Sequence, residues 1–329
     1  MSTRRHFVGA AVAATAALAT GLAHAQEWQP DRPIRLVVPF GAGGSTDIIA
    51  RVLAVKISTT LGQQVVIENK AGAGGIVGTV YVRDAKPDGY TLLMTTIGFG
   101  ANQALYRNRE KKLPFDPVKD FTHVTQLVNM PTVLVVHPGV PVRSAKELVD
   151  LAKAKPGTLT FGSAGLGTIN HLAGEFIKAL TGAKITHVPY RSGAAASTAV
   201  VSGEISMLFA TPPPAIAFIQ SGKMVPLATS GSGKLGLLPD VPPMGATIPG
   251  FDVVEWQGIV GPAGVPKNVV DRLHKEIAAA LKDPAIITRL AQLGAEPVGS
   301  TPQQFEAFVK TELKKWHEVA DKTGMQASE

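Results

Sequence analysis

The chain has 329 residues, of which 45% are hydrophobic and 17% charged, and its formal net charge is +7 at pH 7. Lysines and arginines are spread along the chain and only 6% of the residues are aromatic, which argues against a nucleic-acid-binding surface. Because cysteine is absent, the sequence excludes disulfides, thiolate metal sites, thiol nucleophiles and a lipoprotein anchor.

The N-terminal residues are typical of an export signal. Arg4 and Arg5 precede an apolar run over residues 7–23, which is shorter than a membrane span and leads into a small-x-small cleavage motif. We therefore expect a signal peptide over residues 1–25, cleavage near Ala25/Gln26 and a periplasmic protein. Loss of the two arginines lowers the formal net charge from +7 to +5, which still fits an anionic ligand. The pattern leaves open whether export uses the twin-arginine or the general secretory route.

Strands alternate with helices in the first third of the mature chain. Short apolar or β-branched runs predict strands over residues 34–39, 64–68 and 90–95, and helices over 45–61 and 75–84. In the first of these helices Ile49, Leu53 and Ile57 recur at helical spacing. We therefore expect one face of that helix to lie in the core.

The same order returns in the middle of the chain. Strands are predicted over residues 133–136, 159–161, 187–189, 205–209 and 225–228, and helices over 145–155, 169–180, 194–201 and 215–221. The first of these helices begins with Ser144 and Glu147 in capping-box spacing. Strands that alternate with helices favour parallel sheets with right-handed crossovers.

The C-terminal part follows a different pattern. A strand predicted over residues 253–260 precedes helices over 267–282, 284–293 and 302–322, the last of which begins with Thr301 and Gln304 in capping-box spacing. The simplest closure returns this tail to the first domain. We therefore expect two α/β domains, with residues 26–127 and 251–329 in domain 1 and residues 128–250 in domain 2. Connections near 123–132 and 245–257 would form the hinge.

Each predicted domain has a Gly-rich loop between a strand and a helix. Gly43 and Gly44 lead into Ser45 and Thr46, and residues 162–168 lead into a helix of the second domain. Unpaired N–H groups and a partial positive charge at two facing helix N-termini would form a clamp for a small carboxylate. A single loop of this kind is equally well explained as an ordinary tight connection.

The sequence lacks the common motifs of nucleotide, hydrolase and zinc sites. The first loop has no third glycine of a dinucleotide fingerprint, and no spaced glycines precede a Gly-Lys-Ser/Thr phosphate loop. No Gly-x-Ser-x-Gly elbow and no His-Glu-x-x-His motif occurs. We therefore expect no cofactor, no metal and no catalytic residue.

Six segments together resemble one family and cover essentially the whole mature chain. They are VVPFGAGGSTDIIAR, VVIENKAGAGGIVGT, KPDGYTLLM, FGSAGLGTINHLAGE, HVPYRSGAAAS and WQGIVGPAGVPK. On these motifs the chain is similar to the Bug (TctC-like) family, the extracytoplasmic solute receptors of tripartite tricarboxylate transporters. The resemblance implies a type 2 periplasmic-binding-protein fold, in which two α/β domains on a hinge close over a small organic acid.

The resemblance also implies that the ligand is held by backbone amides, hydroxyls and ordered waters rather than by an arginine clamp. On the first loop the implied residues are Gly43, Gly44, Ser45, Thr46 and Asp47. On the second loop they are Ser163, Ala164, Gly165, Gly167 and Thr168, with His171 at the family's histidine position. Taken alone, a histidine such as His171 is more often packed than bound to a ligand.

Further residues are expected at the cleft because they follow strands or belong to helix-opening loops: Phe40, Ala73, Gly74, Thr96 and Thr211. Thr211 follows the strand that ends at Phe209, a place where the family often has an Asp that could meet a ligand amine. The absence of that Asp favours a plain carboxylate over an amino acid.

The sequence thus predicts a monomeric, non-catalytic periplasmic receptor for a small organic carboxylate, which it delivers to the membrane permease subunits of a tripartite tricarboxylate transporter. Two alternatives stay open: a ligand sensor that signals to a two-component kinase, and a periplasmic enzyme on the same fold. An enzyme would deplete a candidate substrate, whereas a receptor would return it unchanged.

Overall fold

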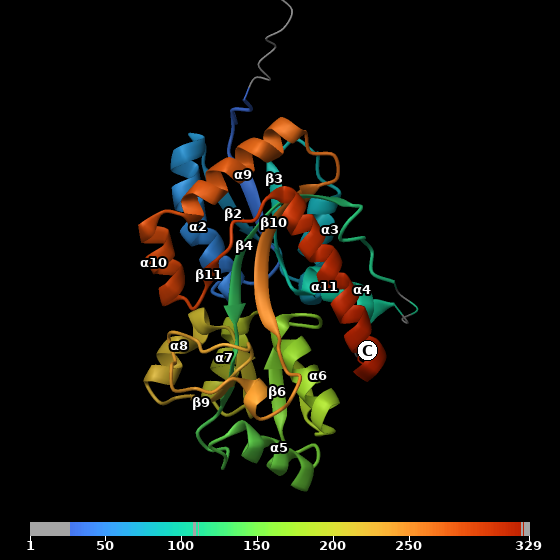
Figure 1. Cartoon of the computed structure of the whole chain (residues 1–329), viewed down its shortest axis with the longest axis vertical. Coiled ribbons are helices and arrows are strands. Elements are labelled where there is room, and N and C mark those ends of the chain that lie inside the picture. The colour runs from blue at the N-terminus through green and yellow to red at the C-terminus, as the bar shows by residue number, and fades with distance from the viewer. Residues whose placement is uncertain (1–26, 108–109, 111, 324, 326–329) are drawn as a thin grey trace, which may run out of the picture.

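The computed structural model describes residues 27–107, 110, 112–323 and 325 (Figure 1). The predicted signal peptide lies outside these residues. The framework is a pair of β-sheets, one above the other along the long axis of the molecule, with helices packed around each (Figure 1). In the described part of the chain, no helix is both long and apolar enough to cross a membrane.

The first sheet has six strands in the order β11-β4-β10-β3-β1-β2. Their bounds are Ile34–Val38 (β1), Val65–Asn69 (β2), Thr91–Thr96 (β3), Phe121–Pro131 (β4), Val254–Pro262 (β10) and Glu296–Pro297 (β11). β1 pairs in parallel with β2 and β3. β10 runs antiparallel to both β3 and β4, so the C-terminal half of the chain contributes a central strand to this sheet.

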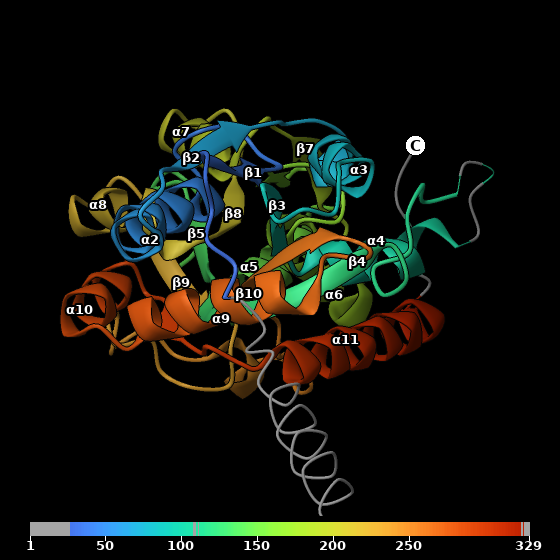
Figure 2. The same ribbon diagram turned by 90° about the horizontal axis from the view of Figure 1, so that it is seen from above.

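The helices around the first sheet come from both ends of the chain. They are α2 (Ser45–Leu61), the short η1 (Ala73–Gly75), α3 (Ile76–Arg83), α4 (Gly98–Tyr106), α9 (Lys267–Leu281), α10 (Pro284–Gln292) and α11 (Pro302–Thr323). Figure 2 shows α9, α10 and α11 in a row along one edge of the molecule. Ile49, Leu53 and Ile57 of α2 are buried in one cluster with Val270 and Leu273 of α9, which confirms the expected core face of α2.

The second sheet has five strands in the order β7-β6-β8-β5-β9. Its strands are β5 (Val133–Val136), β6 (Thr160–Ser163), β7 (Thr186–Pro189), β8 (Met207–Ala210) and β9 (Val225–Thr229). Its helices are α5 (Ala145–Ala154), α6 (Ile169–Thr181), α7 (Gly193–Val201) and α8 (Pro212–Gln220). A short η2 (Met244–Ala246) lies on the path back to the first sheet.

The predicted capping box of Thr301 and Gln304 forms in full, whereas that of Ser144 and Glu147 forms in one direction only. The Glu147 N–H donates to Ser144 Oγ at 3.2 Å, and the Glu147 carboxylate in turn accepts from the N–H of Arg143. Gln304 N–H donates to Thr301 Oγ1 at 3.2 Å while Thr301 N–H donates to Gln304 Oε1 at 2.9 Å. Each box satisfies amide donors that the helix itself leaves unpaired, which explains why these helix starts could be predicted from sequence.

The prediction of parallel sheets is correct for the pairs that β1 and β6 make with their neighbours and wrong for the rest, because both sheets are mixed. β5 runs antiparallel to β8 and β9, and β10 runs antiparallel to β3 and β4. The chain leaves the first sheet through β4 and returns to it through β10, and two neighbouring strands that carry the chain in opposite directions pair antiparallel. Most of the predicted connection at residues 123–132 is therefore strand β4. The helix α4 was missed, since its sequence begins with glycine and follows a strand at once.

The two passages between the sheets are hydrogen-bonded to each other. Thr132, directly after β4, donates its N–H to Ser230 Oγ at 2.9 Å and accepts the Ser230 N–H at 2.8 Å. Ser230 also accepts the N–H of Val253, just before β10, at 2.9 Å. Thr132 and Ser230 are fully buried. The domain boundaries predicted from sequence stay a prediction, but these bonds join the passages between the sheets at one place.

A close contact between β10 and α11 gives a test of this packing. A Cβ added at Gly258 would lie 2.2 Å from Cζ of Phe305, whose side chain is fully buried. We expect Gly258→Ala to lower the free energy of unfolding by about 1–3 kcal/mol through overpacking, measured by urea denaturation. Gly236→Ala is the matched control, because nothing lies within 4 Å of its added Cβ. Equal stability of the two variants would contradict the packing of α11 on β10.

Candidate functional site

A small cavity lies between the two sheets, where strands end and helices begin. It is lined by Phe40, Gly44, Ser45, Thr46, Thr96, Ala164, Thr168, Ile169, Asn170, Gly193, Thr211 and Glu255. Its volume of about 30 Å³ has room for about two water molecules. An organic acid is larger than this, so the loops on the two sides must move apart to admit one.

The N-terminus of α2 forms one wall of the cavity. Gly43 has a φ of +81°, a conformation that favours glycine, and turns the chain into the helix. Gly44 is the N-cap in an extended conformation, and no side chain caps this end. The first-turn N–H groups near Ser45 and Thr46 therefore have no helical partner, and together with the helix dipole they favour an anion here.

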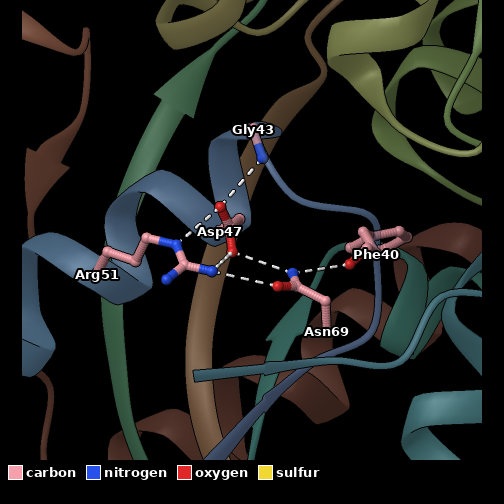
Figure 3. A network of polar contacts seen from close by, with 5 residues as sticks. All are labelled: Phe40, Gly43, Asp47, Arg51 and Asn69. Carbon is pink, nitrogen blue, oxygen red and sulfur yellow. Dashed lines mark hydrogen bonds and ion pairs between the residues drawn. The ribbon is translucent and has the colours of Figure 1, made fainter. Parts of the chain in front are cut away.

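Asp47 does not line the cavity. It lies in a network of polar contacts with Gly43, Arg51 and Asn69 that holds this loop (Figure 3). Its carboxylate accepts the Gly43 N–H at 3.0 Å, two N–H groups of Arg51 at 2.9 and 3.0 Å, and Asn69 Nδ2 at 3.0 Å. Asn69 Nδ2 also donates to the carbonyl of Phe40. Burial raises the pKa of Asp47, but the hydrogen bonds from Arg51, Gly43 and Asn69 outweigh it, so the pKa lies below its usual value. Asp47 is thus an ionised anchor for the loop.

The N-terminus of α6 forms the facing wall. Thr168 is the N-cap, and its hydroxyl donates to the carbonyl of Gly165 at 2.7 Å instead of capping the helix. The first-turn amides of α6 are therefore free of a side-chain cap, as in α2. The N-termini of α2, beside the first sheet, and of α6, beside the second, thus meet at one cavity, and neither has a side-chain cap.

His171 and Ser163 shape the second loop from inside. His171 is 1% exposed, and its Nδ1 accepts the Gly167 N–H at 3.1 Å. Burial, with the nearby His187 adding to it, lowers the pKa of His171 to about 3, so this histidine is neutral at neutral pH. Ser163 Oγ accepts the Gly165 N–H at 3.0 Å. Both side chains therefore set the course of the loop and do not line the cavity.

Ser163 and His187 have the spacing of a nucleophile and its base, with Ser163 Oγ 2.6 Å from His187 Nε2. Three features argue against that role. Ser163 is fully buried, and burial lowers the pKa of His187 to about 4. Among the described residues, no carboxylate is hydrogen-bonded to His187. The described residues also contain no group of His, Asp and Glu that could hold a metal ion.

The other two helix ends at the cavity offer fewer amide donors. The helix α8 begins with Pro212, Pro213 and Pro214, none of which has an N–H group. At the start of α7, the Ser192 side chain already accepts the N–H of Ala195. An anion in the cavity is therefore drawn toward α2 and α6 rather than toward α8.

The structure divides the predicted site residues into three groups. Eight line the cavity: Phe40, Gly44, Ser45, Thr46, Thr96, Ala164, Thr168 and Thr211. Ala73, Gly74 and Gly165 line a neighbouring cavity of about 520 Å³, which shares Phe40 and Ala164 with the first and reaches Tyr190 and Arg191. Those that line neither cavity are Gly43, Asp47, Ser163, Gly167 and His171. As a ligand-binding set, these residues stay a prediction.

Sequence reasoning missed four residues that line the cavity: Ile169, Asn170, Gly193 and Glu255. Asn170 follows the N-cap of α6, and its Nδ2 donates to the carbonyl of Phe209 on β8. Its place in the first turn after the predicted Gly-rich loop was a signal that could have identified it. Glu255 lies on β10, far from either loop in sequence, and nothing local marks it.

Glycines let the two sides of the cleft touch. A Cβ added at Gly98 of α4 would lie 2.5 Å from the carbonyl oxygen of Gly167, and one at Gly74 would lie 2.0 Å from that of Leu166. The Gly41 N–H donates to the carbonyl of Arg191 across the same gap at 3.4 Å. Only a residue without a side chain permits such backbone approach, so the structure shows the cleft in a closed arrangement.

The bracing role of Asp47 can be tested by Asp47→Asn, which keeps the shape but removes the charge. Because the pKa of Asp47 is lowered in the folded state, its stabilisation is present at neutral pH and is lost as the pH falls through that pKa. We expect a loss of about 1–3 kcal/mol at pH 7 that shrinks in acid, measured by denaturation at several pH values.

Asp271→Asn is the matched control, because it breaks another i,i+4 pair, with Lys267, whose side chains are exposed. It should cost less than about 1 kcal/mol. A loss at Asp47 no larger than that at Asp271, or one independent of pH, would show that Asp47 does not anchor the loop.

Comparison with known proteins agrees with this architecture. The chain is similar to the periplasmic binding protein BugD, with 34% identity and a TM-score of 0.86 over 91% of this chain and 100% of that one. It is similar to R. palustris Rpa4515 solved with adipate, with 33% identity and a TM-score of 0.85 over 90% and 98% of the two chains. It is similar to MatC (Rpa3494) from Rhodopseudomonas palustris with bound malate, with 32% identity and a TM-score of 0.83 over 88% and 99%.

These likenesses confirm the predicted fold class, a periplasmic-binding-protein fold built on two α/β units. The sequence model described as "Tripartite tricarboxylate transporter family receptor" matches residues 49–325. The resemblance stated from the motifs is therefore confirmed, and the chain belongs to the TctC family of tripartite tricarboxylate transporter receptors.

Proposed function

We propose that this receptor captures a small organic carboxylate between its two sheets in the periplasm and delivers it to the permease subunits of a tripartite tricarboxylate transporter. The observation that carries the proposal is the meeting of two uncapped helix N-termini, α2 and α6, at one buried cavity. Backbone N–H groups at helix N-termini bind anions without a charged side chain. No Lys or Arg lines this cavity, so its donors include the helix amides and the hydroxyls of Ser45 and Thr46.

The ligand class is a dicarboxylate or a related organic acid. Two similar proteins were solved with adipate and with malate, both of which are dicarboxylates. The neighbouring cavity of about 520 Å³ has room for the body of such a molecule beyond Phe40. Phe40 and Ala164 line both cavities, so an acid can place its head at the helix ends and extend past these two residues.

Capture works by closure of two domains, residues 26–127 with 251–329 and residues 128–250, about the passages near Thr132 and Ser230. A ligand favours the closed arrangement only through contacts that it makes with both domains at once. The facing ends of α2 and α6 supply such contacts. The closed outer shape is then what the permease recognises.

The receptor returns its ligand chemically unchanged. This part of the proposal is supported by the buried Ser163 and the weakly basic His187, which are poorly suited to nucleophilic attack. Incubation with a bound carboxylate should leave its amount constant.

A thermal-shift screen with matched ligand pairs tests the carboxylate clamp. We expect adipate and malate to raise the melting temperature of residues 26–329, whereas the uncharged diamides of the same acids should not. A ligand that binds only the folded state adds about 2.7 kcal/mol at a hundredfold excess over its dissociation constant. A shift caused only by sugars, or equally by acids and diamides, would contradict the clamp.

Closure itself can be tested at Gly98, the first residue of α4. In an open arrangement Gly98→Ala should not lower the free energy of unfolding, because alanine favours a helix more than glycine does. In the closed arrangement its Cβ meets the Gly167 carbonyl at 2.5 Å. We expect a loss of carboxylate affinity of about tenfold or more by calorimetry, with no loss of unfolding free energy.

Gly100→Ala on the same helix is the control, since its added Cβ makes only ordinary contacts at 3.8 Å and beyond. It should bind as the wild type does. Unchanged affinity in Gly98→Ala would show that ligand binding does not bring α4 and the second loop together.

A further inference from the structure

Glu255 is an acidic residue in the wall of a cavity built to receive an anion. It lies on β10 and is 2% exposed, and it lines the cavity with Thr46, Thr168 and Asn170. Its Oε2 is buried and has no hydrogen-bond partner among the described residues. A buried polar atom without a partner is costly, so its presence in a ligand cavity points to a bond that is made only when ligand is present.

The surroundings of Glu255 oppose a negative charge on it. Burial, with repulsion from Glu312 of α11 added to it, raises the pKa of Glu255 well above its usual value. Glu312 Oε2 accepts the indole N–H groups of Trp256 and Trp316, at 3.1 and 3.2 Å, and Glu312 Oε1 lies 3.8 Å from Lys315 Nζ. Burial therefore favours the neutral, protonated form of Glu255, which has one O–H to donate.

No other titratable group near the cavity offers a positive charge that would favour the ionised form of Glu255. On α2, Asp47 is paired with Arg51, and on α6 the buried His171 is neutral. On β4, burial lowers the pKa of His123 to about 4, so it is neutral as well, and β3 has no titratable residue. None of the residues that line the cavity is a lysine or arginine that could pair with an ionised Glu255.

We propose that Glu255 is a specificity residue of this cavity: as a neutral acid it donates a hydrogen bond to the ligand carboxylate that the N-termini of α2 and α6 hold. The inference rests on the proposed function. A neutral Glu255 favours plain carboxylates over ligands that would place an ammonium group beside it. The two helix dipoles disfavour a cation, and a neutral Glu255 offers the cation no counter-charge. A hydrogen bond from a protonated acid to a carboxylate is of the strong, charge-assisted kind.

The pH dependence follows from this role. Ligand binding favours the protonated form of Glu255. While the ligand stays ionised, the affinity is therefore constant below the pKa of Glu255 in the free protein and falls once the pH passes it. Over that range the fall approaches about tenfold per pH unit. The ligand is fully ionised there and contributes no slope of its own.

The experiment compares the wild type with Glu255→Gln and Glu255→Leu, titrating adipate and malate by calorimetry from pH 6 to pH 10. Glutamine has the same shape and an N–H donor but does not titrate, whereas leucine removes the donor. We expect Glu255→Gln to bind at pH 6 much as the wild type does and to keep its affinity at high pH. Glu255→Leu should lose about tenfold or more at every pH.

A second readout guards against misfolding and needs no ligand. Infrared difference spectra of the wild type against Glu255→Gln, with both proteins free of ligand, should contain the C=O band of one protonated carboxyl group. Unfolding midpoints of the three proteins establish that each is folded.

Several results would overturn the proposal. They are unchanged affinity in Glu255→Leu, loss of binding in Glu255→Gln with preference of the wild type for an amine such as 6-aminohexanoate, and absence of the infrared band. Failure of the proposed function is distinguishable, because the wild type and both variants would then all ignore adipate and malate, and the role of Glu255 would fall with it.

Discussion

The cleft depends on backbone N–H groups that two helices leave without partners. α2 follows β1 and α6 follows β6, and each of these strands pairs in parallel with its neighbours, so both helices begin at the carboxyl edge of a sheet. Because these edges face each other, the two helix dipoles converge on one cavity. Side-chain caps would have satisfied the same donors, and the absence of such caps at Gly44 and Thr168 leaves these N–H groups without a side-chain partner at the cavity.

The polar side chains next to these helix ends hold the loops in place. Asp47 fixes the first loop through Gly43, Arg51 and Asn69, and His171 fixes the second through Gly167. Asp47 is already paired and His171 is already neutral, so neither brings an uncompensated charge to the cleft. The fixed dipoles of the two helices therefore favour an anion at the cavity without any reorganisation of these side chains.

Close approach of the two sides sets a second constraint on the same loops. Gly74 and Gly98 meet carbonyl groups of the second loop at distances that exclude any side chain. A loop whose backbone is approached closely by another group needs glycine at the point of approach, because a side chain there would block the contact. The prolines at the start of α8 have no N–H groups, so this helix offers fewer amide donors to the cavity than α2 and α6 do.

The sequence by itself determined most of the strands and helices, both Gly-rich loops and the family, because these depend on hydrophobic spacing, capping residues and glycines that are close together in the chain. The tertiary structure alone decided that the sheets are mixed, that Asp47, Ser163 and His171 face into their own loops, and that Glu255 of β10 reaches the cavity. Pairing direction depends on strands that are distant in the chain, and burial depends on which segments pack over a side chain. No local pattern records either of these.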